Sequence, residues 1–332
     1  MLAYCRVESF PLISKRRFLF VTGKGGVGKT TVCAALGTAL ARAGRRVLVA
    51  TSGAEERLSA VLDVPPIGGQ VVEVRPNLFS VFITPREAMA QYGAMVLKSR
   101  LAYTPLFENK YVTNFFEAVP GLREWAVLGS AWYYANEGLA DGSRRFDTVL
   151  LDAPATGHAL DMLQVPKVIV DVAPSGRLRR DAESAWTMLQ DAEQSGIVVV
   201  TLPEELPATE TLELEQKLRV TFGLPVVGLV INGYTAPLFS AAEAARLARR
   251  IDLLEPGFTI GLAQLAARRA VRERVQSDNL RRLEALKLPR VLLPVHADPP
   301  EGQRRVQALS RYFSRDSAKL RGGFGSSADG RP

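Results

Sequence analysis

The stretch Gly23-Lys24-Gly25-Gly26-Val27-Gly28-Lys29-Thr30-Thr31 decides the fold of this 332-residue chain. It matches the pattern G-x-x-x-x-G-K-S/T of a phosphate-binding loop. The apolar segment RFLFVT (17–22) precedes it, and an alanine- and leucine-rich helical segment (30–43) follows it and stops at Gly44. Because this pattern requires a strand before the loop and a helix after it, the sequence predicts a P-loop.

The composition of the loop explains its chemistry. Glycines let backbone N–H groups turn inward around a phosphate without obstruction from side chains. Lys29 is placed to reach the β- and γ-phosphates, and Thr30 to offer its hydroxyl to Mg²⁺. A plain glycine turn does not explain these two residues at this offset, so we expect a nucleotide site. The residues predicted to bind the nucleotide are Gly23, Gly25, Gly26, Val27, Gly28, Lys29, Thr30 and Thr31.

A second apolar segment carries the matching acid. The sequence TVLLDAPATGH (148–158) contains a predicted strand that ends in Asp152. A carboxylate at such a strand tip holds Mg²⁺ in P-loop NTPases, usually through water. The predicted metal ligands are therefore Thr30 and Asp152, and Lys29 and Asp152 are predicted to be catalytic. Lys24, at the mouth of the loop, is one lysine more than a phosphate cradle needs.

Alternating strand and helix signals predict the fold class. Near-continuous valine, isoleucine and leucine runs are typical of parallel strands that are covered on both faces. We therefore expect a three-layer α/β P-loop NTPase with a mostly parallel sheet. The predicted strands are 17–22, 45–51, 78–84, 146–153, 167–174, 196–201, 226–232 and 290–295. The predicted helices are 30–43, 178–192, 209–222, 241–251, 260–285 and 303–313.

One connection is too long for a simple crossover. About 55 residues separate the third predicted strand from the fourth, so we expect residues 86–140 to form an inserted helical subdomain. The predicted organisation is an N-terminal extension (1–16), a P-loop ATPase domain (17–315) that contains this insertion, and a disordered tail (316–332).

The inserted segment is rich in bulky side chains. Leu122, Trp125, Gly129 and Trp132 fall on one helical stripe. Aromatic side chains at helical spacing are more often part of a core, but surfaces rich in Met and aromatic residues also suit adaptable recognition. A client-binding surface is therefore a hypothesis beside the core interpretation. The other bulky residues are Met89, Tyr92, Met95, Tyr103, Phe107, Tyr111, Phe115, Phe116, Tyr133 and Tyr134.

Composition limits the other possibilities. No apolar run is long enough to span a bilayer and the first residues lack a secretory signal, so we expect a cytoplasmic protein. Two cysteines, Cys5 and Cys33, suit a reducing compartment, and with two scattered histidines they do not make a zinc site. The net charge is +8. The arginines occur in clusters, and Asp and Glu residues are interspersed among them. This pattern is more typical of solvated helix faces than of a surface that binds nucleic acid or an anionic membrane.

The segments KGGVGKTT (24–31) and LLDAPATGHALDMLQVP (150–166) together resemble the deviant-Walker-A ATPases of the SIMIBI class. Within that class the chain is similar to the ArsA family of arsenite-pump and tail-anchored-protein-targeting ATPases. The likeness extends from about residue 17 to 313. It implies ATP or ADP with Mg²⁺ as cofactors. It also implies that Asn232 reads the adenine edge and that the backbone near Pro294 closes the base pocket.

The resemblance gives Lys24 a role. In this class the extra lysine reaches across a dimer to phosphates held by the other subunit, where a cation stabilises charge on the transferring phosphoryl group. By itself, a lysine at this position could equally be a solvated side chain. A dimer is implied, because Lys24 has no comparable task within its own subunit.

The segment after the second predicted strand departs from the family pattern. Relatives carry T-D-P-A there, and the aspartate orients the attacking water. Here the sequence RVLVATSGAEERL puts Ser52 or Gly53 at that place, and Glu55 and Glu56 are expected in the first turn of a helix. Loss of the acid should slow hydrolysis without abolishing nucleotide binding. The chain thus resembles the acid-lacking member of paired bacterial ArsA-like ATPases, which implies a heterodimer with a paralogue or a homodimer.

Two other functions are compatible with parts of this sequence. One is a non-hydrolysing nucleotide-binding subunit with a regulatory task, which Ser52 and Gly53 favour. Another is a MinD- or ParA-like positioning ATPase, which the helical insertion disfavours. Arsenite binding uses clustered thiolates and the targeting ATPases use a C-x-x-C zinc clasp. Neither cluster exists in this sequence, so arsenite pumping and zinc binding are not expected. Nucleic-acid binding is not expected either, because acids are interspersed among the arginines.

Overall fold

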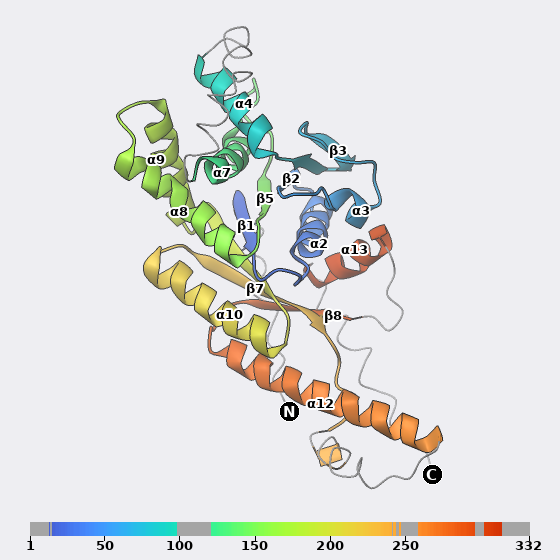
Figure 1. The fold of residues 1–332 in the computed structure, drawn as a ribbon. Helices are drawn as coiled ribbons and strands as arrows, with labels where there is room; N and C mark the ends of the chain where they lie inside the picture. The colour runs from blue at the N-terminus through green and yellow to red at the C-terminus, as the bar shows by residue number, and fades with distance from the viewer. Residues whose placement is uncertain are drawn as a thin grey trace.

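A single sheet forms the centre of the computed structural model, which describes residues 13, 15–97, 121–240, 242–243, 246, 258–295 and 302–313 (Figure 1). In this part of the chain the sheet has eight strands in the order β3-β4-β2-β5-β1-β6-β7-β8. All neighbours are parallel except β3 and β4. The strands are β1 (Phe18–Thr22), β2 (Val47–Thr51), β3 (Val72–Arg75), β4 (Leu78–Phe82), β5 (Thr148–Asp152), β6 (Ser195–Thr201), β7 (Val226–Tyr234) and β8 (Arg290–Pro294).

Helices cover both faces of the sheet, as the strand composition predicts. One face carries α2 (Lys29–Arg42), α3 (Leu58–Leu62) and α13 (Gly302–Ser310), and the other carries α7 (Leu122–Asn136), α8 (Thr156–Val172), α9 (Arg177–Gln190) and α10 (Glu205–Gln216) (Figure 1). Every residue of β1, β2, β5 and β6 is buried. The prediction of a three-layer α/β fold with a mostly parallel sheet is confirmed.

One predicted strand is wrong. Residues 167–174 were expected to form a strand, but most of them form the last turns of α8. Val165 and Ile169 are buried there while Val168 and Val172 are exposed, which is the spacing of a helix and not of a strand. A short run of valine and isoleucine does not distinguish the two by itself, and Pro166, inside α8, suggested a boundary that the chain does not have.

The antiparallel edge strand β3 was not predicted from the sequence. Its residues alternate charged and apolar side chains, and its first two are exposed. The pairing with β4 shifts register between Glu73 and Arg75. Without a buried face, such a short segment carries no strong apolar pattern.

The predicted insertion contains α4 (Pro85–Leu97) and α7, which pack on each other. The side chain of Trp125 is buried and that of Trp132 packs against the core, so these two aromatic residues belong to the core. Tyr133 is 42% exposed. Residues 98–120, with five of the twelve bulky residues of the proposed client surface, lie outside the described residues, as does most of the predicted helix 241–251. The division of the chain into domains stays a prediction.

Two arginines of α9 have acidic partners on the same helix. Arg177 and Arg179 on α9 pair with Asp181 and Glu183, one turn further on. Such pairs are typical of a solvated helix face.

None of the helices in the described ranges is both long enough and apolar enough to cross a membrane.

The long helix α12 (Phe258–Glu284) holds the segment after β7 through buried polar groups. The carboxylate of Glu273 accepts hydrogen bonds from the backbone N–H groups of Leu238 (2.9 Å) and Phe239 (3.3 Å) and from Nε of Arg269 (2.6 Å). The amide of Gln276 both accepts from and donates to the backbone of Thr235. This segment is therefore fixed by side chains rather than by regular secondary structure.

We expect the substitution Glu273→Ala to lower the free energy of unfolding by about 1–3 kcal/mol, because it leaves two N–H groups and a guanidinium without their acceptor. Chemical denaturation measures the change. Asp278→Ala on the same helix is the matched control, since it removes only an exposed ion pair with Arg281. Equal losses for both variants would contradict the anchoring role of Glu273.

Candidate nucleotide-binding site

The loop between β1 and α2 has a backbone that only glycine fits at two positions. Gly23 and Gly28 have positive φ angles of 152° and 90°. A Cβ atom at Gly23 would lie 2.1 Å from the carbonyl oxygen of Val200, and one at Gly28 would lie 2.4 Å from Nδ2 of Asn232. Such contacts are impossible without movement, so the ends of β6 and β7 hold the loop closely. Gly28 also forms the N-terminal boundary of α2, where free backbone N–H groups and the helix dipole favour anions.

The ammonium group of Lys29 is hydrogen-bonded to the backbone of this loop. Its Nζ donates hydrogen bonds to the carbonyl oxygens of Gly23 (3.1 Å) and Lys24 (3.0 Å). Burial lowers the pKa of the Lys29 ammonium, and the charge of Asp152 opposes this shift. The ammonium is therefore held at the centre of the loop with little water around it, where an anion would stabilise its charged form.

Thr30 and Asp152 meet at the carboxyl edge of the sheet. Oγ1 of Thr30 donates a 2.6 Å hydrogen bond to Oδ2 of Asp152, which is 7% exposed. Burial raises the pKa of Asp152, and the hydrogen bond from Thr30, the charge of Lys29 and a hydrogen bond from Cys33 oppose the shift. The structure thus brings together the two residues predicted to hold a metal ion. A buried carboxylate whose ionised form is disfavoured by desolvation gains from a bound cation.

Lys24 has an ion-pair partner within its own subunit. Its Nζ lies 2.5 Å from Oε1 of Glu210, on α10, and both side chains are about one-third exposed. An ion pair at this exposure contributes only about 0–1 kcal/mol. Lys24 is thus held in place by a weak contact that another anion could replace. Glu210 lies far from Lys24 in the sequence and belongs to no nucleotide motif, so sequence reasoning had no signal for this pairing.

The segment after β2 brings no carboxylate to the loop. Glu55 forms an exposed ion pair with Arg57 at 3.3 Å. Oε1 of Glu56 accepts a 2.9 Å hydrogen bond from the backbone N–H of Ser59, at the start of α3. Both acids therefore precede α3 instead of lying in its first turn, and each has a partner away from Asp152.

The other predicted nucleotide contacts lie at the ends of neighbouring strands. Asn232, near the end of β7, donates a 2.9 Å hydrogen bond from Nδ2 to the carbonyl oxygen of Val27 in the loop. Pro294 ends β8 and pairs in register with Tyr234 of β7. Both thus lie at the carboxyl edge of the sheet, where open α/β sheets bind ligands. The roles of Asn232 and Pro294 toward a base stay predictions.

The segment that follows Asp152 leads directly into α8. This helix begins at Thr156, whose Oγ1 is buried and has no hydrogen-bond partner among the described residues. Gly157 and His158 are exposed. The segment DAPATGH (152–158) therefore starts at the buried acid and ends on the surface.

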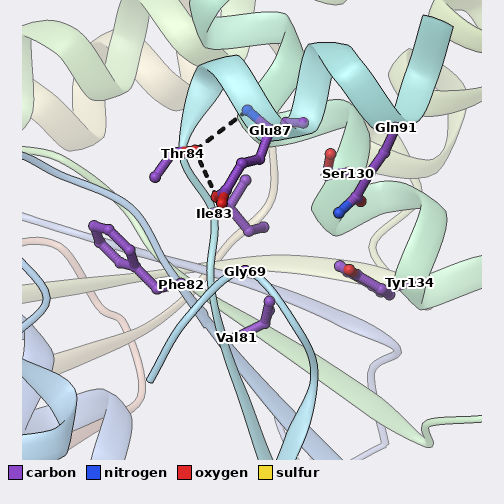
Figure 2. A pocket seen from close by; sticks show the side chains of 10 residues that line it. Gly69, Val81, Phe82, Ile83, Thr84, Glu87, Gln91, Ser130 and Tyr134 are labelled. Atoms are coloured by element: carbon purple, nitrogen blue, oxygen red, sulfur yellow. Dashed lines mark hydrogen bonds between the residues drawn. The ribbon is translucent and has the colours of Figure 1, made fainter. Parts of the chain in front are cut away.

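Figure 2 shows a small cavity at a different place, between the end of β4 and the start of α4. Its volume is about 10 Å³, which is room for the centre of one water molecule. Oγ1 of Thr84 donates to Oε2 of Glu87 (2.7 Å) and accepts from the Glu87 N–H (3.2 Å), which caps α4. A Cβ atom at Gly69 would lie 2.8 Å from Oε2 of Glu87. The cavity is part of this cap, and none of its lining residues belongs to the phosphate loop.

A family model described as an anion-transporting ATPase matches residues 16–175, which include the loop, Asp152 and the start of α8. The ATPase BagA of Mycobacterium tuberculosis is 28% identical over 305 residues, which cover 86% of this chain and 89% of that protein. Over these residues the chain is similar to the ArsA family of ATPases. The arsenical pump-driving ATPases of Acidiphilium multivorum and Escherichia coli are each 29% identical over 234 residues. These residues cover 65% of the chain but only 39% of each pump-driving ATPase.

This similarity to ArsA-family ATPases supports the prediction of nucleotide binding in general terms. The individual site residues and their roles stay predictions. Among the described residues no group of three or more His, Cys, Asp or Glu side chains is arranged to hold a metal ion. That zinc and arsenite play no part also stays a prediction.

The clash at Gly23 leads to a test of the loop geometry. We expect Gly23→Ala to abolish nucleotide binding, because a backbone carbonyl 2.1 Å away cannot yield as a side chain can. The control is Gly26→Ala, where φ is also positive (83°) but no atom lies within 4 Å of the added Cβ. It should cost about 1 kcal/mol of stability and retain binding. Calorimetric titration with ATP measures both, and equal affinities would show that the Val200 contact does not constrain the loop.

Proposed function

We propose that the chain is a Mg²⁺-dependent ATP-binding switch whose nucleotide occupies the loop between β1 and α2. The observation that carries this proposal is the 2.6 Å contact between Thr30 and the buried Asp152, on the same loop and helix start as the half-buried Lys29. A hydroxyl and a carboxylate at this place suit the metal, and the ammonium suits the phosphates. ADP would bind in the same place.

The residues present fit the implied ligands. Backbone N–H groups from Gly25 to Thr31 would surround the phosphates, and Lys29 would exchange its carbonyl partners for phosphate oxygens. Thr30 and Asp152 would hold Mg²⁺, a metal that is commonly bound by one or two protein oxygens, water and substrate phosphates. When bound, Mg²⁺ offsets the negative charge of the phosphates. Asn232 and the backbone at Pro294 would contact the base.

Hydrolysis by the isolated chain should be slow. Ser52 and Gly53 supply no carboxylate to orient an attacking water, and Glu55 and Glu56 each have other partners. A missing orienting group reduces the rate of the chemical step more than it reduces nucleotide affinity. We therefore propose that a partner subunit completes the ATPase. The alternative is a regulatory subunit that binds nucleotide without hydrolysing it, which the same observation favours.

ArsA-like ATPases are commonly dimeric. For this chain we propose a homodimer, or a heterodimer with an ArsA-like paralogue, in which Lys24 reaches the phosphates of the other subunit. The ion pair with Glu210 is weak enough to exchange for a triphosphate. A cytoplasmic location and a protein client on the helical insertion, controlled by nucleotide state, are parts of the same proposal. A MinD- or ParA-like positioning function has less support, because residues 86–140 have no counterpart there.

Turnover and binding separate the candidate functions. We expect the chain alone to bind Mg·ATP and to hydrolyse it slowly. Lys29→Ala should weaken binding by at least about tenfold, because a half-buried cation no longer faces the phosphates. Calorimetry and phosphate release measure these values, with Lys217→Ala, an exposed lysine, as the control. Full ATPase activity of the isolated chain would contradict the partner-completed mechanism. No stimulation by a paralogue would favour the regulatory subunit.

A second experiment concerns the ion pair of Lys24. We expect Lys24→Ala to abolish ATP-dependent dimerisation while the affinity of a single subunit for ATP stays within about twofold. Glu210→Gln should strengthen the dimer by at most about fivefold, because it removes a competing carboxylate worth up to about 1 kcal/mol. Glu213→Gln, an exposed neighbour on α10, is the control. Analytical ultracentrifugation with and without ATP measures all three. A Lys24→Ala protein that still dimerises with ATP would refute the role in trans.

A further inference from the structure

Two strands end in buried threonine hydroxyls that have no hydrogen-bond partner among the described residues. They are Oγ1 of Thr22, at the end of β1, and Oγ1 of Thr51, at the end of β2. Thr22 is fully buried and Thr51 is 5% exposed. Buried hydroxyls without a protein partner are uncommon in folded proteins and usually bind a water molecule or a ligand. These two differ in the face of the sheet on which they lie.

Thr51 lies on the same face as the predicted metal ligands. In β2, the alternate residues Val47 and Val49 pack in the cluster that contains α2, and Thr51 continues this alternation. In β5, Leu150 packs in the same cluster, so Asp152 also lies on the α2 face. Thr22, by contrast, continues the alternation of Phe18 and Phe20, which pack on the opposite face of the sheet.

Thr51 and Asp152 are direct neighbours across two parallel strands. Their Cα atoms are register partners between β2 and β5. Neighbouring strands lie about 4.8 Å apart, and one water molecule accepts or donates hydrogen bonds of about 2.8 Å on each side. Two oxygens on the same face at this spacing can therefore share one water. The Thr51 backbone is fixed here, because its carbonyl oxygen accepts a 2.7 Å hydrogen bond from the N–H of Ile83.

We propose that Thr51 is a positioning residue for the metal-bound nucleotide. Its hydroxyl and the carboxylate of Asp152 together hold one water molecule of the hydration shell of Mg²⁺. This inference rests on the proposed function of the site. Mg²⁺ keeps several of its waters in proteins, and such waters need acceptors in the protein. Asp152 already accepts a hydrogen bond from Thr30, so a neutral acceptor on its other side completes the set.

A role of Thr51 in affinity alone agrees with the absence of a carboxylate in the residues that follow it. Thr51 immediately precedes Ser52 and Gly53, where this chain has no carboxylate. A hydroxyl can order a water molecule but cannot take its proton, because its basicity is too low at neutral pH. Thr51 therefore contributes to metal and nucleotide affinity, and it leaves the chemical step to a group that this segment lacks.

The test compares three substitutions by calorimetric titration of ADP, with and without Mg²⁺. Thr51→Val removes the hydroxyl at nearly constant shape and should weaken Mg·ADP binding by about tenfold, the effect of one lost hydrogen bond to a polarised water. Binding of ADP without metal should change by less than about twofold. Thr51→Ser should restore the affinity. Thr22→Val, which removes the corresponding hydroxyl on the other face, should alter neither titration.

Stability supplies a second measurement. Thr51→Val should be at least as stable as the unmodified protein without nucleotide, because it removes a buried polar atom that has no partner. A destabilised Thr51→Val protein would show that the hydroxyl serves the fold, and it would overturn the inference. Equal losses of affinity with and without Mg²⁺, or an unchanged Mg·ADP affinity, would do the same. If the unmodified protein binds no adenine nucleotide at all, the proposed function fails as well.

Discussion

The hydrogen bond between Thr30 and Asp152 depends on the order of the strands. Asp152 ends β5 and Thr30 lies in the first turn of α2, which follows β1. They meet because β1 and β5 are adjacent and parallel, so that their carboxyl ends reach the same edge. A strand inserted between β1 and β5 would separate the acid from the loop. The topology of the sheet thus brings these two side chains together, and their chemistry then determines what the site can bind.

Burial has opposite effects on the two charged groups of this site. It lowers the pKa of Lys29 and raises that of Asp152, so both ionised forms are disfavoured by desolvation and supported by each other. Phosphate and metal would add the counter-charge that each group lacks. Binding would require Lys29 to exchange its carbonyl partners for phosphate oxygens, while its charge and the loop dipoles already lie at the site.

The parts that sequence predicted are those fixed by local pattern. The loop, the strand that ends in Asp152 and the three-layer fold follow from residue spacing and from continuous apolar runs. The segment 167–174 was assigned wrongly, because a short apolar run fits a strand and a buried helix equally well. The ion pair of Lys24 with Glu210 depends on how α10 packs beside the loop, which no spacing encodes. The place of Thr51 beside Asp152 follows from the register between β2 and β5, which the sequence alone does not give.

The site therefore separates holding a nucleotide from cleaving it. The groups that suit phosphate and metal have partners within this chain, whereas Ser52 and Gly53 stand where the resemblance implies a water-orienting acid. Interactions that stabilise the bound nucleotide and the transition state equally raise the affinity for the nucleotide without raising the rate of hydrolysis. Under the proposed function, such a chain would keep its nucleotide until a partner supplies the absent group. The ion pair of Lys24 with Glu210 is weak, so that lysine could exchange this contact for the phosphates of a second subunit.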